Sequence, residues 1–219
     1  MDNALCTIVG AGPGVSLAVA RRFGREGFRI ALIARRENAL ADYQVELATA
    51  GVESFGFAAD AGDAQSLRGA FERITNQLGP TAVLVYNVAA STPGTPSSLD
   101  GERLVEAFRS NVVGALVASQ QVLPQMQTTG SGTMLFTGGG LALSPWPQAA
   151  ALAVGKAGLR NLVYSLAAEL EPAGIHVATV TIAGMVQPGT EFDPERIADV
   201  YWQLHSEPRG KWQREIIFR

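Results

Sequence analysis

Short apolar runs alternate with longer stretches of helical periodicity along almost the whole chain, and this alternation constrains the fold most. The strand-like runs are 4–9, 28–34, 52–58, 82–88, 133–136, 175–182 and 216–218. The helical stretches are 15–26, 37–50, 64–78, 100–127, 148–171 and 194–205. Strictly alternating strands and helices predict a parallel sheet with right-handed crossovers and helices on both faces. Because the 219 residues contain no linker or repeat, we expect one doubly wound α/β domain over 1–219.

Charge and composition exclude several classes of partner. The net charge of −3 argues against nucleic acid, because phosphate binding needs a basic patch. The apolar runs are too short to cross a bilayer, and no basic or cleavable leader precedes the first strand. The only cysteine, Cys6, cannot form an intrachain disulfide. We expect a cytoplasmic protein without membrane or nucleic-acid partners, and we assign no metal ligands.

A glycine-rich loop, VGAGPGVS, joins the first strand to the first helix. Glycines allow a tight turn and the close approach of a pyrophosphate, and the helix N-terminus offers free N–H groups and the positive end of its dipole. Ser16 stands where a small residue permits close packing of helix on strand. The alternative is a glycine turn without a ligand, but the strand–loop–helix context favours a nucleotide site. The residues expected to contact the phosphates are Gly10, Gly12, Pro13, Gly14 and Val15.

The end of the second strand indicates which dinucleotide is bound. An NAD site usually has an acidic residue there, whereas this chain reads Ile33-Ala34-Arg35-Arg36. The guanidinium of Arg35 can form charge-assisted hydrogen bonds with a 2′-phosphate. We therefore predict NADP(H) over NAD(H). The alternative is that both arginines are solvated loop charges.

Several further motifs, in matching order and spacing, resemble the short-chain dehydrogenase/reductase family over nearly the whole chain. The glycine loop is similar to that family's TGxxxGxG, "VLVYNVAA" to its NNAG segment and "IAGMVQ" to its PGxVxT turn. The resemblance implies a Rossmann-type seven-stranded sheet of order 3-2-1-4-5-6-7. It also implies hydride transfer between a nicotinamide cofactor and a small carbonyl or alcohol substrate, in a homodimer or homotetramer.

The resemblance also implies roles for individual residues. Asp60 and Ala61 match the segment beside the adenine, and Gly184 and Val186 match the turn beside the nicotinamide. Asn111 matches the helix asparagine that holds a proton-relay water. The remaining matches are Lys156, which would hold the nicotinamide ribose, and the cofactor-contacting residues Asn87, Val88 and Ala89.

The catalytic motif itself departs from the family pattern. The family uses a tyrosine four residues before the lysine as general acid/base, and a serine about thirteen residues before that tyrosine. With Lys156 as the lysine, the tyrosine position is Leu152 and the serine position is Gly139. Since leucine cannot transfer a proton, the usual mechanism cannot run as written. Of the family's catalytic set, Asn111 and Lys156 remain.

Replacement groups are few. Tyr164 lies about 12 Å along the helix axis from Lys156, which is too far, and Tyr86 should point away from Asn87. Ser144 could act as a hydroxyl donor, and Lys156 as an acid if burial lowers its pKa. The late-helix pair, Tyr201 and His205, could border a substrate. Each also has a structural interpretation: loop serine, ribose-binding lysine, or surface or interface pair.

The C-terminal part indicates an open site and self-association. Residues 185–194 leave room only for a shortened substrate lid, and the aromatic-rich ending is typical of interface anchors. Three hypotheses follow. The chain is an NADP(H)-dependent oxidoreductase with a divergent site, a non-catalytic NADP(H)-binding sensor or regulator, or an oligomer partner with a vestigial site.

Overall fold

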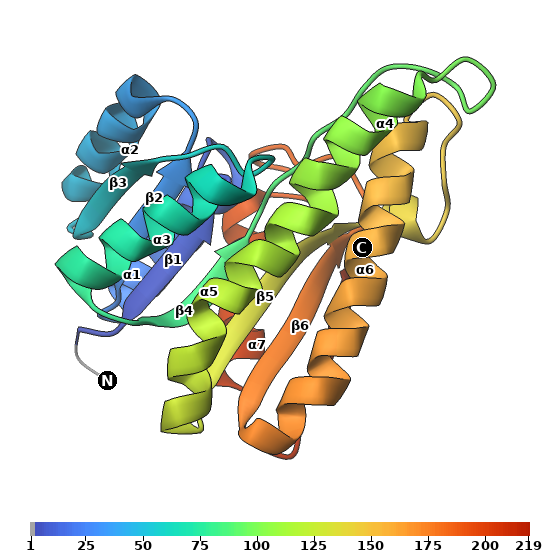
Figure 1. Ribbon diagram of the computed structural model, residues 1–219. Helices are drawn as coiled ribbons and strands as arrows, with labels where there is room; N and C mark the ends of the chain where they lie inside the picture. Colours follow the sequence, from blue (N-terminus) through green and yellow to red (C-terminus); the bar gives the residue numbers. More distant parts are fainter. Residues whose placement is uncertain (1–2) are drawn as a thin grey trace.

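The computed structural model describes residues 3–219, which form one seven-stranded, wholly parallel sheet flanked by helices (Figure 1). The strands are β1 Leu5–Val9, β2 Arg29–Ala34, β3 Ser54–Ala58, β4 Thr81–Tyr86, β5 Gly132–Gly139, β6 Ile175–Ile182 and β7 Glu215–Phe218. Their order, β3-β2-β1-β4-β5-β6-β7, confirms the predicted topology. Met1 and Asp2, where the sequence indicated no leader, lie outside the described residues.

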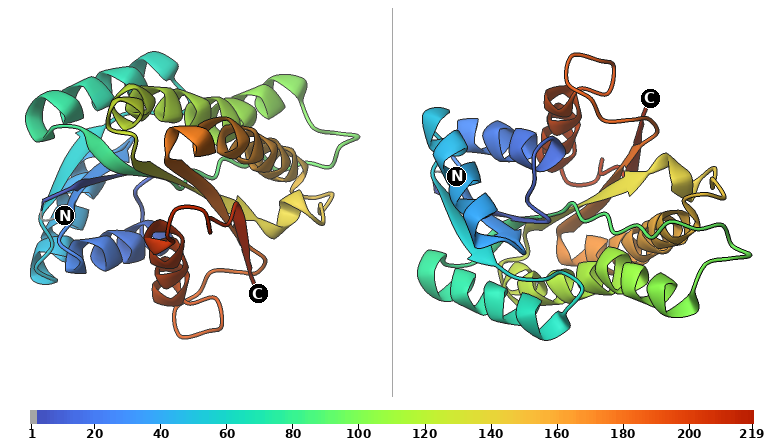
Figure 2. Two further views of the ribbon diagram at one scale, coloured as in Figure 1. Left: turned by 90° about the horizontal axis from the view of Figure 1, so that it is seen from below. Right: turned by 90° about the horizontal axis from the view of Figure 1, so that it is seen from above.

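The helices form two layers, one on each face of the sheet (Figure 2). They are α1 Val15–Arg25, α2 Glu37–Thr49, α3 Ala64–Leu78, α4 Gly101–Phe108, α5 Gly114–Thr129, α6 Ala150–Leu170 and α7 Pro194–Ser206. Helices α1, α2 and α7 cover one face, and α3, α5 and α6 cover the other. Successive residues of β1 serve opposite layers: Ile8 packs under α1, and Val9 packs under α3 and α5. Helices on both faces explain why the central strands are almost entirely apolar.

The long helix predicted at 100–127 is interrupted. Asp100 caps the start of α4 by accepting from the N–H of Arg103, and α4 and α5 are joined by a π-helical turn at Arg109–Val113. Insertions of this kind occur mostly at functional sites. Here the turn brings Asn111 to a fully buried position against α6. Local propensity carries no signal for this change of register, because packing against α6 sets it.

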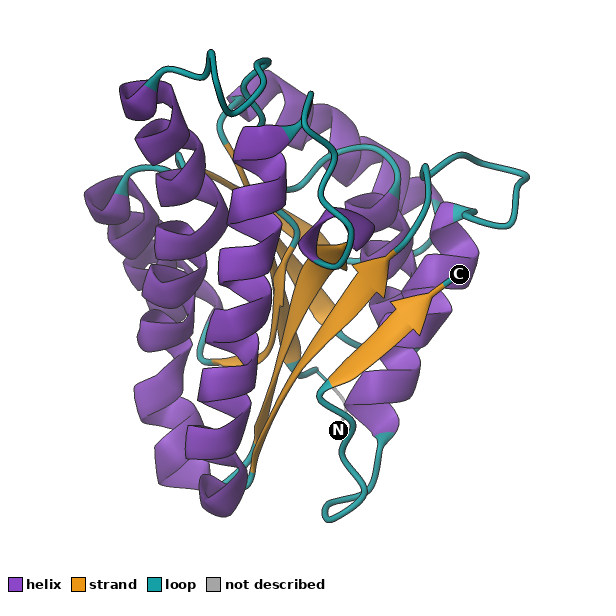
Figure 3. Cartoon of the chain, turned by 90° about the vertical axis from the view of Figure 1, so that its right-hand side faces the viewer, coloured by secondary structure: helices purple, strands orange, loops and turns teal. Residues whose placement is uncertain are grey.

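Two strand boundaries also differ from the prediction. The strand predicted at 82–88 is β4, which ends at Tyr86, so Asn87 and Val88 lie in the loop that follows. The strand predicted at 52–58 begins at Ser54. The difference in β4 moves Asn87 and Val88 from the sheet into a loop at its carboxyl edge, where the parallel strands end (Figure 3).

The aromatic residues of the late helix are used within the chain. Tyr201 is fully buried, and its hydroxyl lies 2.6 Å from the hydroxyl of Thr137. Trp202 packs edge-on against Phe23, and His205 lies in the same cluster. The prediction that Tyr201 lies at the surface or in an interface is therefore wrong. Its side chain lies between α7 and β5, on the same buried face of α7 as Ile197 and Leu204.

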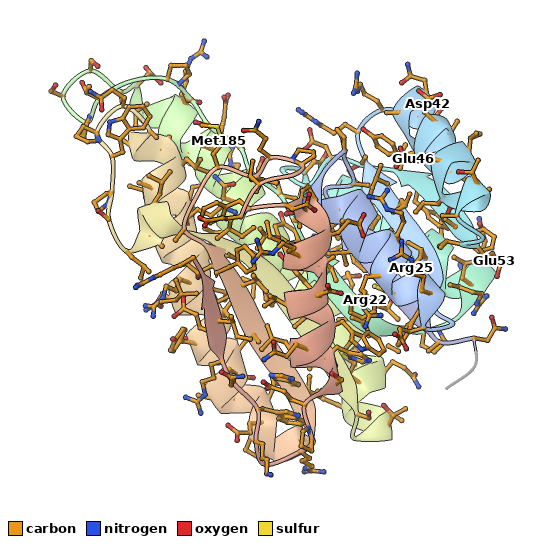
Figure 4. The ribbon with its side chains drawn as sticks, turned by 180° about the vertical axis from the view of Figure 1, so that it is seen from behind. Arg22, Arg25, Asp42, Glu46, Glu53 and Met185 are labelled. Carbon is orange, nitrogen blue, oxygen red and sulfur yellow. The ribbon has the colours of Figure 1, made fainter. Side chains whose placement is uncertain are left out.

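Two arginines of α1 form ion pairs with acidic residues of α7. Arg21 donates to Glu195 through Nε and Nη2, at 2.8 and 2.6 Å, and also pairs with Glu46 of α2. Arg22, labelled on α1 in Figure 4, donates to Asp199 at 2.9 Å. These half-exposed pairs supplement the apolar α1–α7 contact, which supplies most of the stability.

The described part of the chain contains neither a candidate membrane-spanning helix nor a candidate metal-binding cluster. No helix within residues 3–219 is long and apolar enough to cross a membrane. The longest, α6, carries Lys156, Arg160 and Glu169. Over the same residues, no three His, Cys, Asp or Glu side chains gather in a metal-binding group. Cys6 is free and buried in β1, where burial raises the pKa of its thiol.

Candidate functional site

A cleft of about 380 Å³ opens at the carboxyl ends of β1, β2 and β4. It lies where the strand order reverses, which is the usual ligand position in open α/β sheets. The residues predicted to bind a cofactor that line this cleft are Gly10, Gly12, Pro13, Arg35, Asp60, Ala61, Asn87, Val88 and Ala89. Ser110, which the sequence analysis did not single out, also lines it, although its position beside Asn111 was a usable signal.

The glycine loop is fixed to the strands on both sides of β1. The backbone N–H groups of Gly10 and Ala11 both donate to the carbonyl of Ile33 at 2.9 Å. Gly10 has φ +85°, and a Cβ there would lie 2.6 Å from the carbonyl oxygen of Asn87. A Cβ on Gly12 would meet nothing within 4 Å, so the backbone there faces open space. Only glycine suits the first position, and the second leaves room for a ligand.

Helix α1 starts beside this loop with uncommitted donors. Its N-cap, Gly14, has φ +88°, and no side chain caps the helix. The first turn, which begins at Val15, contains no acidic residue. The first N–H groups of a helix have no partner within the helix, and they attract anions. This end of α1 therefore suits a phosphate, although Gly14 and Val15 do not line the cleft itself.

Two arginines border the cleft at the end of β2. Arg35 lines it, and an adjoining hollow of about 480 Å³ is lined by Arg35, Arg36 and Tyr43 among others. Within residues 3–219, neither guanidinium takes part in an ion pair. Across the cleft, Asp60 accepts a hydrogen bond from the N–H of Gly62 at 2.8 Å. The guanidinium of Arg35 is thus available to an anionic ligand in the cleft, whereas Arg36 lines only the adjoining hollow.

Lys156 of α6 has buried, uncharged partners. Its side chain is 6% exposed, and Nζ donates to the carbonyl of Thr137 at 2.6 Å and to that of Val88 at 3.3 Å. Burial lowers the pKa of this ammonium to about 8. A Cβ on Gly139 would lie 3.5 Å from Lys156 Cγ, so Gly139 stands beside the stem of the lysine. The sequence analysis did not predict that Thr137 binds Lys156, because Thr137 accepts this hydrogen bond through its backbone carbonyl.

Asn111 is paired with the backbone of Ala90. Its Nδ2 donates to the carbonyl of Ala90 at 2.7 Å, and its Oδ1 accepts from the N–H of Ala90 at 2.8 Å. Gly155 of α6 makes room for this side chain, because a Cβ there would lie 2.6 Å from Asn111 Nδ2. Asn111 and Lys156 therefore both hold the segment that follows β4. That segment, which includes Val88 and Ala90, forms a wall of the cleft.

A second cleft, of about 620 Å³, opens at the carboxyl ends of β5 and β6. Gly184, predicted at the cofactor, lines this cleft, whereas Val186 lines neither of the two. Ser144 also lines the second cleft. Tyr164 is bonded elsewhere, donating to Glu215 at 2.8 Å. Tyr86 donates to the carbonyl of Ser110, behind the first cleft.

A parallel doubly wound sheet with a glycine loop at its switch point defines a Rossmann-type nucleotide-binding protein. The family model described as short chain dehydrogenase matches residues 4–198. The chain belongs to the short-chain dehydrogenase/reductase family of NAD(P)-dependent oxidoreductases.

Curated relatives match most of the chain at moderate identity. A putative ketoacyl reductase of Streptomyces coelicolor is 28% identical over 211 residues, covering 94% of this chain and 79% of the relative. The 2-(S)-hydroxypropyl-CoM dehydrogenase 3 of Xanthobacter autotrophicus is 29% identical over 202 residues, covering 89% and 79%. Both matches cover most of this chain, as does the family model.

Solved structures show the same fold. A short-chain dehydrogenase from Rhodopseudomonas palustris superposes with a TM-score of 0.89 at 27% identity, covering 100% of this chain and 99% of that one. A metagenomic short-chain oxidoreductase in complex with NADP gives a TM-score of 0.90 at 22% identity, covering 99% and 97%. The strand order expected from the family resemblance is therefore that of known structures.

Proposed function

We propose that this chain is an NADP(H)-binding oxidoreductase of the short-chain type, acting on a small carbonyl or alcohol substrate through a divergent site. One observation carries the proposal: Lys156 lies between the two clefts. Its ammonium donates to Val88 in the wall of the first, and its stem passes Gly139, whose neighbour Gly140 lines the second. A nicotinamide cofactor, when bound, supplies or accepts the hydride.

The residues at the first cleft fit a phosphorylated dinucleotide. Gly12 and the uncapped start of α1 offer backbone donors for the pyrophosphate. Arg35 offers a cation without an ion-pair partner for a 2′-phosphate, and Asp60 lies across the cleft for the adenine. The metagenomic neighbour of similar fold binds NADP. These features together favour NADP(H) over NAD(H).

The proposed site differs from the family pattern in the source of the proton and not in the source of the hydride. Reducing a carbonyl to an alcohol adds a hydride to carbon and a proton to oxygen. We propose that Leu152 and Gly139 occupy the places of the family's tyrosine and serine, so neither can supply that proton. The nearby donors are the ammonium of Lys156, whose lowered pKa suits an acid at neutral pH, and the hydroxyl of Ser144.

The second candidate is a non-catalytic protein that binds NADP(H) as a sensor or regulator. Leu152 and Gly139 favour it, because they remove proton transfer while leaving the first cleft complete. Under either function, we propose that 1–219 is one domain with a shortened lid at 185–194, and that it forms a homodimer or homotetramer. The lid proposal is supported by the segment's own turn, in which Gln187 donates to Phe192 at 3.1 Å.

Calorimetric titration with NADPH and NADH tests cofactor binding. We expect NADPH to bind more tightly, and Arg35→Ala to reduce the NADPH/NADH affinity ratio at least about tenfold, by losing charge-assisted hydrogen bonds. Arg36→Ala is the matched control, since it removes the neighbouring charge outside the first cleft. An unchanged ratio in Arg35→Ala would refute the NADP(H) assignment.

A panel of carbonyl and quinone substrates distinguishes the two functions. Turnover by the natural chain supports the oxidoreductase, whereas tight NADPH binding with no turnover supports the sensor. The double variant Leu152→Tyr, Gly139→Ser tests whether the rest of the site is intact. Gly139 has extended backbone, and a Cβ there makes only ordinary contact with Lys156, so the serine fits. A gain of about 10²–10⁴-fold in reductase rate is expected from restored acid catalysis.

A further inference from the structure

The rim of the second cleft exposes an unusual amount of apolar surface. Leu143, Trp146 and Met185 are 43%, 59% and 82% exposed, although they are large hydrophobic side chains. All three line the same cleft. Leu143 and Trp146 come from the loop after β5, and Met185, which Figure 4 labels, comes from the loop after β6. Exposed apolar residues that gather in a concavity mark binding sites, whereas scattered ones carry no such meaning.

A single charged side chain lies at this apolar surface. Among residues 3–219, Arg219 is the only residue lining the cleft whose side chain is charged, and the only side-chain hydroxyl there is that of Ser144. Within residues 3–219, Arg219 forms no ion pair. The end of β7 places it there, since the carbonyl of Phe218 accepts from the N–H of Ala183 at 2.9 Å. An unpaired guanidinium beside apolar walls favours an anion, which it can bind through two parallel hydrogen bonds.

The cleft adjoins the position assigned to the reaction. Gly140 forms part of its lining, and the preceding Gly139 contacts the stem of Lys156. A molecule seated between Trp146 and Met185 thus reaches toward Lys156 at one end. Arg219 directly follows β7, the strand next to β6, and can bind an anionic group at the other end of the same molecule.

We propose that the second cleft selects carbonyl or alcohol substrates that combine an apolar, flat body with one anionic group, a carboxylate or a phosphate, bound by Arg219. This inference rests on the proposed function for its reaction, but the binding it describes does not need the cofactor. Trp146, Leu143 and Met185 enclose the apolar body, and Arg219 discriminates anionic from neutral molecules of the same shape.

Matched probes test the inference on the full chain. The probes are 2-naphthoate and the neutral 2-naphthamide, titrated by calorimetry and followed by the indole N–H resonance of Trp146. Only three tryptophans are present, so Trp146→Phe assigns that resonance. We expect both probes to shift it, and 2-naphthoate to bind at least about tenfold more tightly through its charge-assisted hydrogen bonds.

Two arginine variants separate the specific effect from general charge. Arg219→Gln should bring 2-naphthoate to the affinity of 2-naphthamide and leave the amide unchanged. Arg214→Gln is the control, because Arg214 precedes β7 and pairs with Glu171 at the opposite end of the strand. Equal affinities of the two probes for the natural chain would overturn the inference, as would an equal loss in both variants.

Further outcomes distinguish this inference from the proposed function. If NADPH binds in a separate titration but 2-naphthoate does not shift the Trp146 resonance, the inference fails alone. If 2-naphthoate binds as expected and NADPH does not, the cleft stands as an anion-selective site and the proposed function fails. A third outcome is that Trp146→Ser converts an oligomer to a monomer and that neither probe binds the natural chain. The apolar rim is then an interface between copies, which also overturns the inference.

Discussion

The side-chain amide of Asn87 donates to the hydroxyl of Ser16 at 2.6 Å, and that hydroxyl donates to the carbonyl of Gly10 at 2.8 Å. Asn87 follows β4 and Gly10 follows β1, so these two bonds join the strands on either side of the switch point. Ser16 is fully buried at the second position of α1. The glycine loop is therefore held in shape by the protein itself, before any ligand contributes.

The two bonds predict coupled losses of stability. Asn87→Ala and Ser16→Ala should each lower the free energy of unfolding by about 1–2 kcal/mol, since each removes at least one hydrogen bond of the buried Ser16 hydroxyl. The double variant should lose clearly less than the sum of the two, because both changes break the same chain of bonds. Urea unfolding measures this. Asn161→Ala, at an exposed position on α6, is the control with little expected effect. Strict additivity would contradict the prediction.

The pairing of Asn111 with Ala90 predicts a pH-dependent defect in one variant. In Asn111→Asp, one carboxylate oxygen can still accept from the N–H of Ala90, but the other faces its carbonyl oxygen without a proton between them. This arrangement disfavours the charged form, so the aspartate pKa is raised in the folded state. A raised pKa means that the folded state holds the proton longer. The loss of stability should therefore grow as pH rises from about 4 toward neutrality, reaching about 2–4 kcal/mol.

Urea unfolding at pH 5 and pH 7, each compared with the natural chain, measures this difference. Asn111→Leu provides the matched control, because leucine removes both hydrogen bonds but has no titrating group. Its loss of stability should be similar at the two pH values. The prediction requires that the free energy of unfolding depends on pH differently in the two variants. The same pH dependence in both would show that the side chain at position 111 does not face both the N–H and the carbonyl of Ala90.

The sequence contained enough to place most of the first cleft. Gly10, Arg35 and Asn87 each come directly after a strand, and Asp60 is the second residue after β3. Parallel strands bring their carboxyl ends to one edge of the sheet. Alternating strands and helices predict that edge without any knowledge of side-chain contacts. The order of the strands came instead from the resemblance to a family, since periodicity does not specify which strands are neighbours.

Features set by tertiary packing were not predictable in this way. The π-helical turn holding Asn111 depends on the absence of a side chain at Gly155, which lies on a different helix. Tyr201 shares the buried face of α7 with Ile197 and Leu204, but its hydroxyl partner, Thr137, lies on β5 and could not be read from the sequence of α7. The sequence identified Lys156, but not the two backbone carbonyls that hold its ammonium. A carbonyl belongs to every residue, so the sequence gives no sign of it.

Glycines of two helices should respond to alanine in opposite ways. Gly155→Ala would place a Cβ 2.6 Å from Asn111 Nδ2, and the buried amide cannot move without losing its bonds to Ala90. We expect a loss of about 1–3 kcal/mol from overpacking. Gly69→Ala, in α3, would meet only the end of the Arg73 side chain at 3.8 Å. There alanine should stabilise by about 0.5–1 kcal/mol through helix propensity. Thermal or urea unfolding compares them, and equal stabilities would refute the close approach of α6 to the π-helical turn.

The buried ammonium of Lys156 predicts a rise of stability with alkaline pH. Its folded-state pKa of about 8 lies below its ordinary value of 10.5. Below about pH 8 the proton is bound in both states, so stability is independent of this group. Above that, the folded state releases the proton while the unfolded state keeps it, and stability rises until about pH 10.5. Because one pKa unit corresponds to about 1.4 kcal/mol, the full rise is at most about 3.5 kcal/mol.

Unfolding by urea from pH 7 to pH 10, without cofactor, measures this rise as the difference between the natural chain and Lys156→Met. Taking the difference cancels the titration of all other groups that the substitution leaves unperturbed. Lys156→Arg is the control, because a guanidinium keeps its charge throughout this range and should show no rise relative to Lys156→Met. A flat difference for the natural chain would mean that water or an unrecognised anion solvates the ammonium. Lys156 would then lack the lowered pKa that makes it a candidate acid in place of Leu152.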